Sequence, residues 1–204
     1  MVKLEKNFMK GCSSAGRAQV SKTWCREFDP CHPCHVCYTG GLMEGNKTKS
    51  RALLVFGAPC SGKTTFAEKF AKKFGLAYYN LEELKAENNF SFENILLILS
   101  LIARTGQTII FEGCLKTENE RAEIRKLLVK NGYEPTLIWI QTDVATIRMR
   151  LKQRYKSVSK AKEIYEKEVD TIEAPTDTER PIILSGKHTF ETQSKHVIIG
   201  LSEL

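Results

Sequence analysis

The glycine-rich segment Gly57–Thr64 has the residue types and spacing best suited to chemistry. It reads Gly-Ala-Pro-Cys-Ser-Gly-Lys-Thr and matches the pattern G-x-x-x-x-G-K-T in full. In this pattern the glycines let consecutive backbone N–H groups face the phosphates of a nucleotide. We expect Lys63 to reach the β- and γ-phosphates and the Thr64 hydroxyl to ligate Mg²⁺. The residues expected to bind ATP with Mg²⁺ are Gly57, Ala58, Pro59, Cys60, Ser61, Gly62, Lys63, Thr64 and Thr65.

The elements on both sides of this segment are the ones that the pattern requires. Arg51–Phe56 is a short apolar run of the buried-strand type. After the segment, apolar residues recur at helical spacing: Phe66, Ala67, Phe70, Ala71 and Phe74. An ordinary glycine-rich turn that happens to contain Lys-Thr is the alternative. The order of strand, loop and helix favours a phosphate-binding loop.

The rest of the chain repeats the alternation of strands and helices. Further strands are expected at residues 76–80, 108–113, 136–140 and 181–184. Helices are expected at residues 92–104, 121–130, 144–155 and 160–173, with a final one from about Thr192. Apolar strands separated by helices predict a parallel sheet covered on both faces. The expected fold class is therefore α/β, a P-loop NTPase three-layer sandwich with a mostly parallel five-stranded sheet.

Three segments together resemble small P-loop kinases: Gly57–Thr65, Ala103–Gly113, and Leu137–Asp143 with the arginines that follow it. The similar groups are the AAA-domain predicted kinases, the zeta-toxin kinases and the 5′-kinase domain of phage polynucleotide kinase. The resemblance covers about residues 51–200. It implies an ATP-dependent, Mg²⁺-requiring kinase that phosphorylates a hydroxyl of a small-molecule or nucleotide-like acceptor. A nucleic-acid 5′ end is a less favoured acceptor.

The resemblance also implies roles for the residues after the second expected strand. These kinases place Asp-x-x-Arg there, whereas this chain has Glu82-Glu83-Leu84-Lys85. By this resemblance Glu82 accepts the proton of the acceptor hydroxyl, and Glu83 and Lys85 help to bind the acceptor. Glu is one methylene longer than Asp, and Lys lacks the bidentate fork of Arg. The alternative is that Glu82 and Glu83 are ordinary acids in the first turn of a helix.

Charged residues of the third expected strand and of the helix expected at 144–155 are further candidates. Glu112 ends the third strand, where carboxylates of P-loop enzymes hold Mg²⁺ or its water near the loop threonine. The alternative is a strand-end carboxylate without a metal. By similarity, Arg148 and Arg154 are expected to close over the γ-phosphate as part of a lid. The alternative is a basic helix face that points into solvent.

Two cysteines, Cys60 and Cys114, lie after the N-terminal region. Cys60 and Cys114 could lie near each other at the site as reduced thiols.

A nucleotide-binding switch or adaptor that phosphorylates no acceptor is the main alternative function. No Asn-Lys-x-Asp motif for guanine is present in the sequence, which argues against a GTPase.

The N-terminal region differs in composition from the remainder. Residues 1–49 carry 8 Lys and Arg against 4 Asp and Glu, whereas residues 51–204 carry 23 against 20, so the body is not strongly basic. Five of the seven cysteines lie in the first 37 residues. A zinc site or a haem-attachment site could use these residues: Cys31, His32, Cys34, His35 and Cys37.

A second interpretation covers more of this region. Codons for Cys12–Ala18 can reproduce the D-arm of a transfer-RNA gene, and codons for Arg26–Pro30 can reproduce its T-arm. The separation of fifteen codons between Ser13 and Phe28 fits the distance between those arms. Residues 1–42 thus resemble a translated tRNA gene, which makes Met43 the natural start. We expect a non-native or disordered extension at 1–42, a linker at 43–50 and a P-loop kinase-like domain at 51–204.

No membrane segment is expected. The longest apolar run, Ile95–Ala103, is far shorter than the roughly 20 residues that span a bilayer. No apolar run follows the first six residues, as a secretory signal would require. We expect a cytoplasmic protein without a membrane partner.

Overall fold

A computed structural model describes residues 50–169 and 171–203 of the chain. The predicted extension at 1–42, its Cys/His cluster and the linker up to residue 49 lie outside the described residues. The described residues all belong to one compact unit, Lys49–Leu204.

Five strands form one sheet, as expected. They are β1 (Ser50–Gly57), β2 (Ala77–Asn80), β3 (Ile109–Glu112), β4 (Tyr133–Gln141) and β5 (Ile182–Ser185). Their order is β2-β3-β1-β4-β5, and every pair is parallel. Because β1 is the central strand, its segment Ala52–Phe56 is buried on both faces, which accounts for the continuous apolar run. The sheet is thus parallel throughout.

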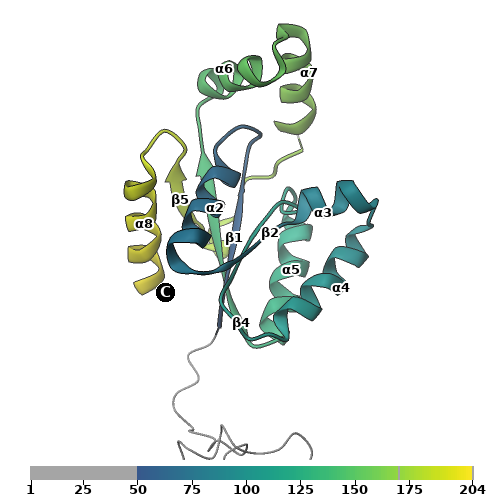
Figure 1. The fold of residues 1–204 in the computed structure, drawn as a ribbon, viewed down its shortest axis with the longest axis vertical. Helices are drawn as coiled ribbons and strands as arrows, with labels where there is room; N and C mark the ends of the chain where they lie inside the picture. The colour runs from purple at the N-terminus through teal and green to yellow at the C-terminus, as the bar shows by residue number, and fades with distance from the viewer. Residues whose placement is uncertain (1–49, 170, 204) are drawn as a thin grey trace, which may run out of the picture. The chain divides into compact units, whose positions relative to one another are not determined.

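Helices cover both faces of this sheet (Figure 1). On one side, α4 (Phe92–Ala103) and α5 (Glu118–Lys130) pack against the sheet. On the other side lie α2 (Lys63–Phe74) and α8 (Phe190–Ser202). Two separate apolar clusters result, one per face, and they confirm the predicted three-layer sandwich.

The remaining helices lie towards the carboxyl ends of the strands. Helix α3 (Leu81–Asn88) follows β2 directly. Helices α6 (Val144–Tyr155) and α7 (Val158–Val169) pack on each other and project beyond the sheet (Figure 1). A short 3₁₀ helix spans Asp177–Glu179. The carboxyl edge of a parallel sheet is where α/β proteins bind ligands, so α3, α6 and α7 surround the expected site.

Some expected bounds are wrong, and side-chain caps account for where two of the helices begin. The last helix begins at Phe190 rather than at about Thr192, because the Thr189 side chain caps it. The helix expected at 160–173 is α7, which ends at Val169. At residues 81–88 a helix was expected only under the alternative in which Glu82 and Glu83 are first-turn acids. The structure has that helix, α3, and the Asn80 side chain starts it by accepting a hydrogen bond from the Glu83 amide.

Within the part of the chain that the structure describes, no helix has the length and apolar character needed to cross a bilayer.

Candidate active site

The glycine-rich segment forms the turn between β1 and α2. At Gly57 the backbone has φ +151°, and a Cβ atom there would lie 2.3 Å from the Ile140 carbonyl oxygen. Only glycine therefore lets the loop pass so close to β4. Gly62, with φ +107°, is the N-cap of α2, and the Lys63 ammonium donates a hydrogen bond to the Ala58 carbonyl over 3.1 Å. The loop, its lysine and the helix N-terminus have the arrangement that binds phosphates.

Thr64 and Glu112 meet beside this loop. Strand β3 pairs with β1 so that Val55 lies opposite Glu112, which brings the carboxylate to the first turn of α2. The Thr64 hydroxyl donates a 2.6 Å hydrogen bond to Oε1 of Glu112. Oε2 of the same carboxylate is buried and has no hydrogen-bond partner among the described residues. Burial raises the pKa of Glu112, although the Thr64 hydrogen bond and the Lys63 charge oppose that shift.

This pair of residues fits Mg²⁺. The ion prefers oxygen ligands and keeps several waters, so one hydroxyl and one carboxylate can suffice. The unpartnered Oε2 of Glu112 offers a negative oxygen to a cation. Among residues 50–169 and 171–203, no group of three or more His, Cys, Asp or Glu could hold a metal. The Thr64 hydroxyl and the Glu112 carboxylate, 2.6 Å apart, are the oxygen donors that would hold the ion.

Tyr78 is a neighbour of this pair that the sequence analysis missed. Its hydroxyl, on β2 next to β3, is buried and lies close to the Glu112 carboxylate, although no hydrogen bond of standard geometry joins it to that carboxylate or to another described group. Burial raises the pKa of Tyr78 above its usual value, and the negative charges of Glu112 and Glu68 raise it further. The phenol therefore keeps its proton next to the Glu112 carboxylate.

A cavity of about 900 Å³ opens beside the loop, and we call it the main cavity. Its wall includes the glycine-rich loop, the start of α3, the inner faces of α6 and α7, and the segment from β5 into α8. Lys63, Thr64 and Glu82 all line it, so the structure brings these three predicted residues together. Glu112 contributes through its hydrogen bond to Thr64.

Glu82 is placed by a close approach of α3 to the loop after β3. At Gly113 (φ +87°), a Cβ atom would lie 2.7 Å from Cγ and 2.8 Å from the amide nitrogen of Glu82. The Glu82 carboxylate pairs with the Lys116 ammonium at 3.3 Å. Glu83 is exposed, and neither Glu83 nor Lys85 is among the residues that line the main cavity. The structure thus brings only the first member of the expected acceptor-binding group to the cavity.

The arginines of α6 divide between two faces of that helix. Arg150 and Arg154, four residues apart, line the main cavity. Arg150 donates hydrogen bonds to the carbonyl oxygens of Cys60 (3.1 Å) and Gly186 (3.0 Å), and so ties α6 to the loop and to the segment after β5. Arg148 does not line the cavity: it is exposed and its guanidinium lies 5.0 Å from the centre of the Tyr165 ring.

Arg150 is the residue of this helix that the sequence analysis missed. The spacing of four from Arg154 was the available signal, because residues four apart share a helix face. Arg148 lies six residues from Arg154, a spacing that does not keep two side chains on one face. Choosing the correct face requires knowing how α6 rotates against the sheet.

The two cysteines are not brought into one cluster. Cys114 is buried in the apolar cluster under α4 and α5. Cys60 packs at the edge of the α6 and α7 cluster, within the glycine-rich loop. Both are free thiols, and burial raises the pKa of Cys114 to about 11.

Comparisons with known proteins agree with this architecture. The sequence matches the family described as AAA domain over residues 53–177. A gluconokinase from Sinorhizobium meliloti 1021 has a similar structure (TM-score 0.61, 12% identity, 76% of this chain and 93% of that chain). So does the APS kinase CysC of Mycobacterium tuberculosis in complex with AMPPNP and APS (0.59, 18%, 76% and 98%). Kti12 of Chaetomium thermophilum in complex with ADP-AlF3 is also similar (0.59, 15%, 74% and 97%).

At these identities the likeness shows the fold, which is that of P-loop kinases. No protein of curated function matches the sequence.

Proposed function

The chain belongs to the AAA-domain family, and from that premise and the geometry of the main cavity we propose that it is an ATP-dependent phosphotransferase. It transfers the γ-phosphoryl group to a hydroxyl of a small-molecule or nucleotide-like acceptor. The observation that carries the proposal is the Thr64–Glu112 contact of 2.6 Å, next to Lys63 and in a cavity that Glu82 also lines. Phosphate-binding, metal-binding and proton-accepting groups thus share one site.

Each of these residues has a definite task in phosphoryl transfer. Lys63 and the backbone amides of the loop bind the phosphates and stabilise the charge of the transferred group. Glu82 accepts the proton of the attacking hydroxyl. Arg154 faces the same cavity from α6 and adds positive charge on the lid side. Thr64 and Glu112 would hold Mg²⁺, which when bound neutralises charge on the phosphate oxygens.

ATP is the proposed donor. The support is the fold: two of the structures that share it contain an adenine nucleotide or its analogue, AMPPNP in one and ADP-AlF3 in the other. The acceptor is proposed only as a hydroxyl compound. The gluconokinase and the APS kinase act on different acceptors, so a shared fold does not select one.

An acceptor screen tests the proposal. The full chain is incubated with Mg–ATP and, in turn, D-glucose, adenosine, kanamycin or a 5′-hydroxyl oligothymidylate, and ADP release is measured. Turnover that depends on one acceptor supports the kinase. Tight nucleotide binding without acceptor-dependent turnover would favour a nucleotide-controlled switch, and absence of binding at millimolar ATP would contradict both.

A further inference from the structure

Lys116 is the only Lys or Arg whose ammonium or guanidinium forms an ion pair with Glu82 in the described part of the chain. Its ammonium lies 3.3 Å from Oε1 of Glu82, on α3, and 4.0 Å from Oε2 of Glu168, on α7. These three residues also line a small cavity of about 20 Å³, to which Lys63 and Gly57 contribute from the glycine-rich loop. Lys116 therefore joins α3 and α7 beside a cavity that Lys63 of the glycine-rich loop also lines.

The backbone of Lys116 is fixed by hydrogen bonds on both sides of the residue. Its amide donates to Glu120 over 2.9 Å. Its carbonyl accepts from the Arg121 guanidinium over 3.2 Å and from the Glu173 amide over 2.9 Å. With both backbone groups held, the residue cannot turn its side chain away from Glu82 by a backbone rotation alone.

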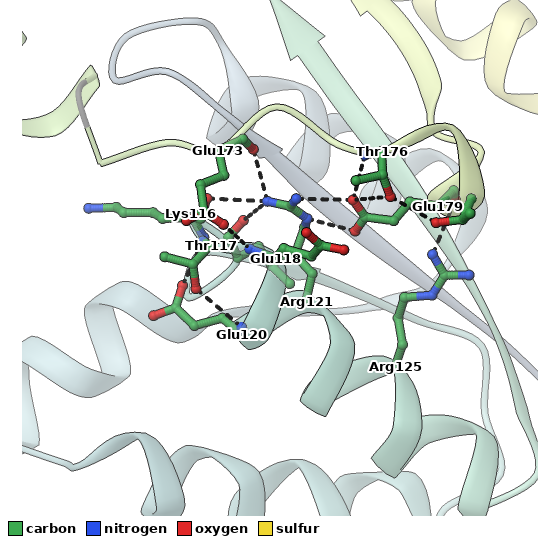
Figure 2. A network of polar contacts seen from close by, with 11 residues as sticks. Lys116, Thr117, Glu118, Glu120, Arg121, Arg125, Glu173, Thr176 and Glu179 are labelled. Carbon is green, nitrogen blue, oxygen red and sulfur yellow. Dashed lines mark hydrogen bonds and ion pairs between the residues drawn. The ribbon is translucent and has the colours of Figure 1, made fainter.

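Arg121 is the centre of the network that holds this loop. It is fully buried and binds Glu179 with two hydrogen bonds, of 2.7 and 3.0 Å. It also donates to the Glu173 carbonyl over 3.0 Å. Figure 2 shows the Arg121 guanidinium between Glu173 and Glu179, while the Lys116 side chain points away from this network. The chain that leaves α7 is thus anchored at the same loop that presents Lys116.

From this arrangement we propose that Lys116 is a positioning residue, which holds Glu82 in the wall of the main cavity and couples it to α7 through Glu168. The proposal rests on the proposed function, in which Glu82 accepts the acceptor's proton. The kinases that this chain resembles place Asp at the position of Glu82. Glu is one methylene longer and has one more rotatable bond. The ion pair with Lys116 limits the rotation of that longer side chain.

The charges at Lys116 support this role rather than a structural one. Partial burial alone would lower the pKa of Lys116, but the carboxylates of Glu82 and Glu168 outweigh burial and raise it, so the ammonium stays charged. The side chains of Lys116 and Glu82 are 37% and 43% exposed. Ion pairs with this exposure contribute little to folding stability, so their removal should leave the fold intact.

The test compares Lys116→Met with a matched control, Lys162→Met. Lys162 also pairs with a carboxylate of α7, Glu166 at 3.7 Å, but forms no ion pair with Glu82 among the described residues. Hydrogen exchange of the full chain with AMPPNP and Mg²⁺ is the first readout. We expect Lys116→Met to speed exchange in both 81–88 and 158–169, and Lys162→Met to act on 158–169 alone. Unchanged exchange at 81–88 in Lys116→Met would overturn the proposal.

Turnover with the best acceptor of the screen is the second readout. Misplacement of a catalytic group lowers the reaction rate by up to about 10²-fold. We therefore expect Lys116→Met to lower kcat by about 10- to 100-fold and to leave the KM for ATP unchanged. Lys116→Arg should restore much of the loss, because it keeps the charge. In a Glu82→Gln background, Lys116→Met should have no further effect. An equal loss in that background would overturn the proposal.

The two readouts separate this proposal from the proposed function. If the wild-type chain phosphorylates no acceptor, the proposed function fails, and Lys116 as a positioning residue for catalysis fails with it. The exchange result still decides whether Lys116 couples α3 to α7. If the wild-type chain is active and Lys116→Met matches it, only the role of Lys116 is wrong.

Discussion

The hydroxyl of Thr64 lies 2.6 Å from a carboxylate oxygen of Glu112, although 48 residues separate them in the chain. The contact exists because parallel pairing of β1 and β3 places the end of β3 beside the first turn of α2. It joins a loop that binds phosphates to a buried carboxylate with one free oxygen. This contact is the structural basis for expecting Mg²⁺ at the site.

Replacement of Glu112 by Gln should weaken the dependence on Mg²⁺. The amide has the same size and can still accept the Thr64 hydrogen bond, but it lacks the charge that attracts a cation. We expect turnover to fall by about 10²-fold, and we expect the Mg²⁺ concentration that gives half of the maximal rate to rise. A titration of Mg²⁺ at saturating ATP measures both. Glu134→Gln, an exposed strand carboxylate paired with Arg51, is the control; equal effects of the two changes would contradict a metal role.

Replacement of Gly113 by Ala should disturb Glu82. The new Cβ would meet the Glu82 amide nitrogen at 2.8 Å, so α3 must shift. Gly132→Ala is a matched control, because Gly132 has a similar φ (+82° against +87°) but no atom within 4 Å of its Cβ position. We expect Gly113→Ala to be less stable than Gly132→Ala by about 1–3 kcal/mol. Urea unfolding measures this difference, and turnover should fall only in Gly113→Ala.

The Arg121–Glu179 pair should make stability depend on pH in the acidic range. Burial alone would raise the pKa of Glu179, but hydrogen bonds from Arg121 and the Thr176 amide outweigh burial and lower it. A carboxyl group whose pKa is lowered in the folded state stabilises the fold at pH values above its unfolded-state pKa, which is about 4.3 for Glu. That stabilisation is lost as pH falls through the folded-state value.

Glu179→Gln tests this linkage. The change leaves a charged guanidinium buried without its partner, so at pH 7 we expect a loss of about 3–5 kcal/mol. The difference from the wild type should begin to narrow below about pH 4.3, because Glu179 then takes up a proton in the unfolded wild type but not in the folded one. It should close as pH falls through the lower folded-state pKa of Glu179. Urea unfolding at pH 7 and at pH 3 to 4 measures the difference in the free energy of unfolding between the variant and the wild type. Glu166→Gln, in an exposed pair, should cost little at either pH.

The two cysteines of the described part should react very differently with iodoacetamide. The pKa of Cys114, raised by burial to about 11, leaves almost no thiolate at pH 8. Cys60 is partly exposed in the glycine-rich loop and lines the main cavity. We expect Cys60 to be alkylated first and to be protected by Mg–ATP. Peptide mass spectrometry identifies the modified residue; faster alkylation of Cys114, or Cys60 labelling that ATP does not change, would contradict the site.

Local patterns predicted most of the fold. The loop at Gly57–Thr64 and the order of strands and helices depend on neighbours in sequence, so the chain itself displays them. Helix α3 is shorter and buries only Leu81, which leaves no apolar period to detect. Its start depends on the Asn80 cap.

The rest of the site depends on contacts between distant segments. Nothing in the spacing links Arg121 to Glu179, 58 residues away, and an arginine in a charged helix usually lies in solvent. Likewise, the role of Lys116 can be inferred only once the structure shows its ion pairs with Glu82 of α3 and Glu168 of α7. The choice between Arg148 and Arg150 depends on the rotation of α6.

Transfer of labelled γ-phosphate from Mg–ATP to the acceptor, measured for the wild type, Lys63→Ala and Glu82→Gln, tests the central claim most directly. We expect Lys63→Ala to lose about 10²–10³ in rate. Glu82→Gln should lose about 10²–10⁴ while nucleotide affinity stays near that of the wild type. Full activity of Glu82→Gln would contradict its role as the base. A labelled acceptor formed equally well by Lys63→Ala, or no labelled acceptor from the wild type, would contradict the kinase itself.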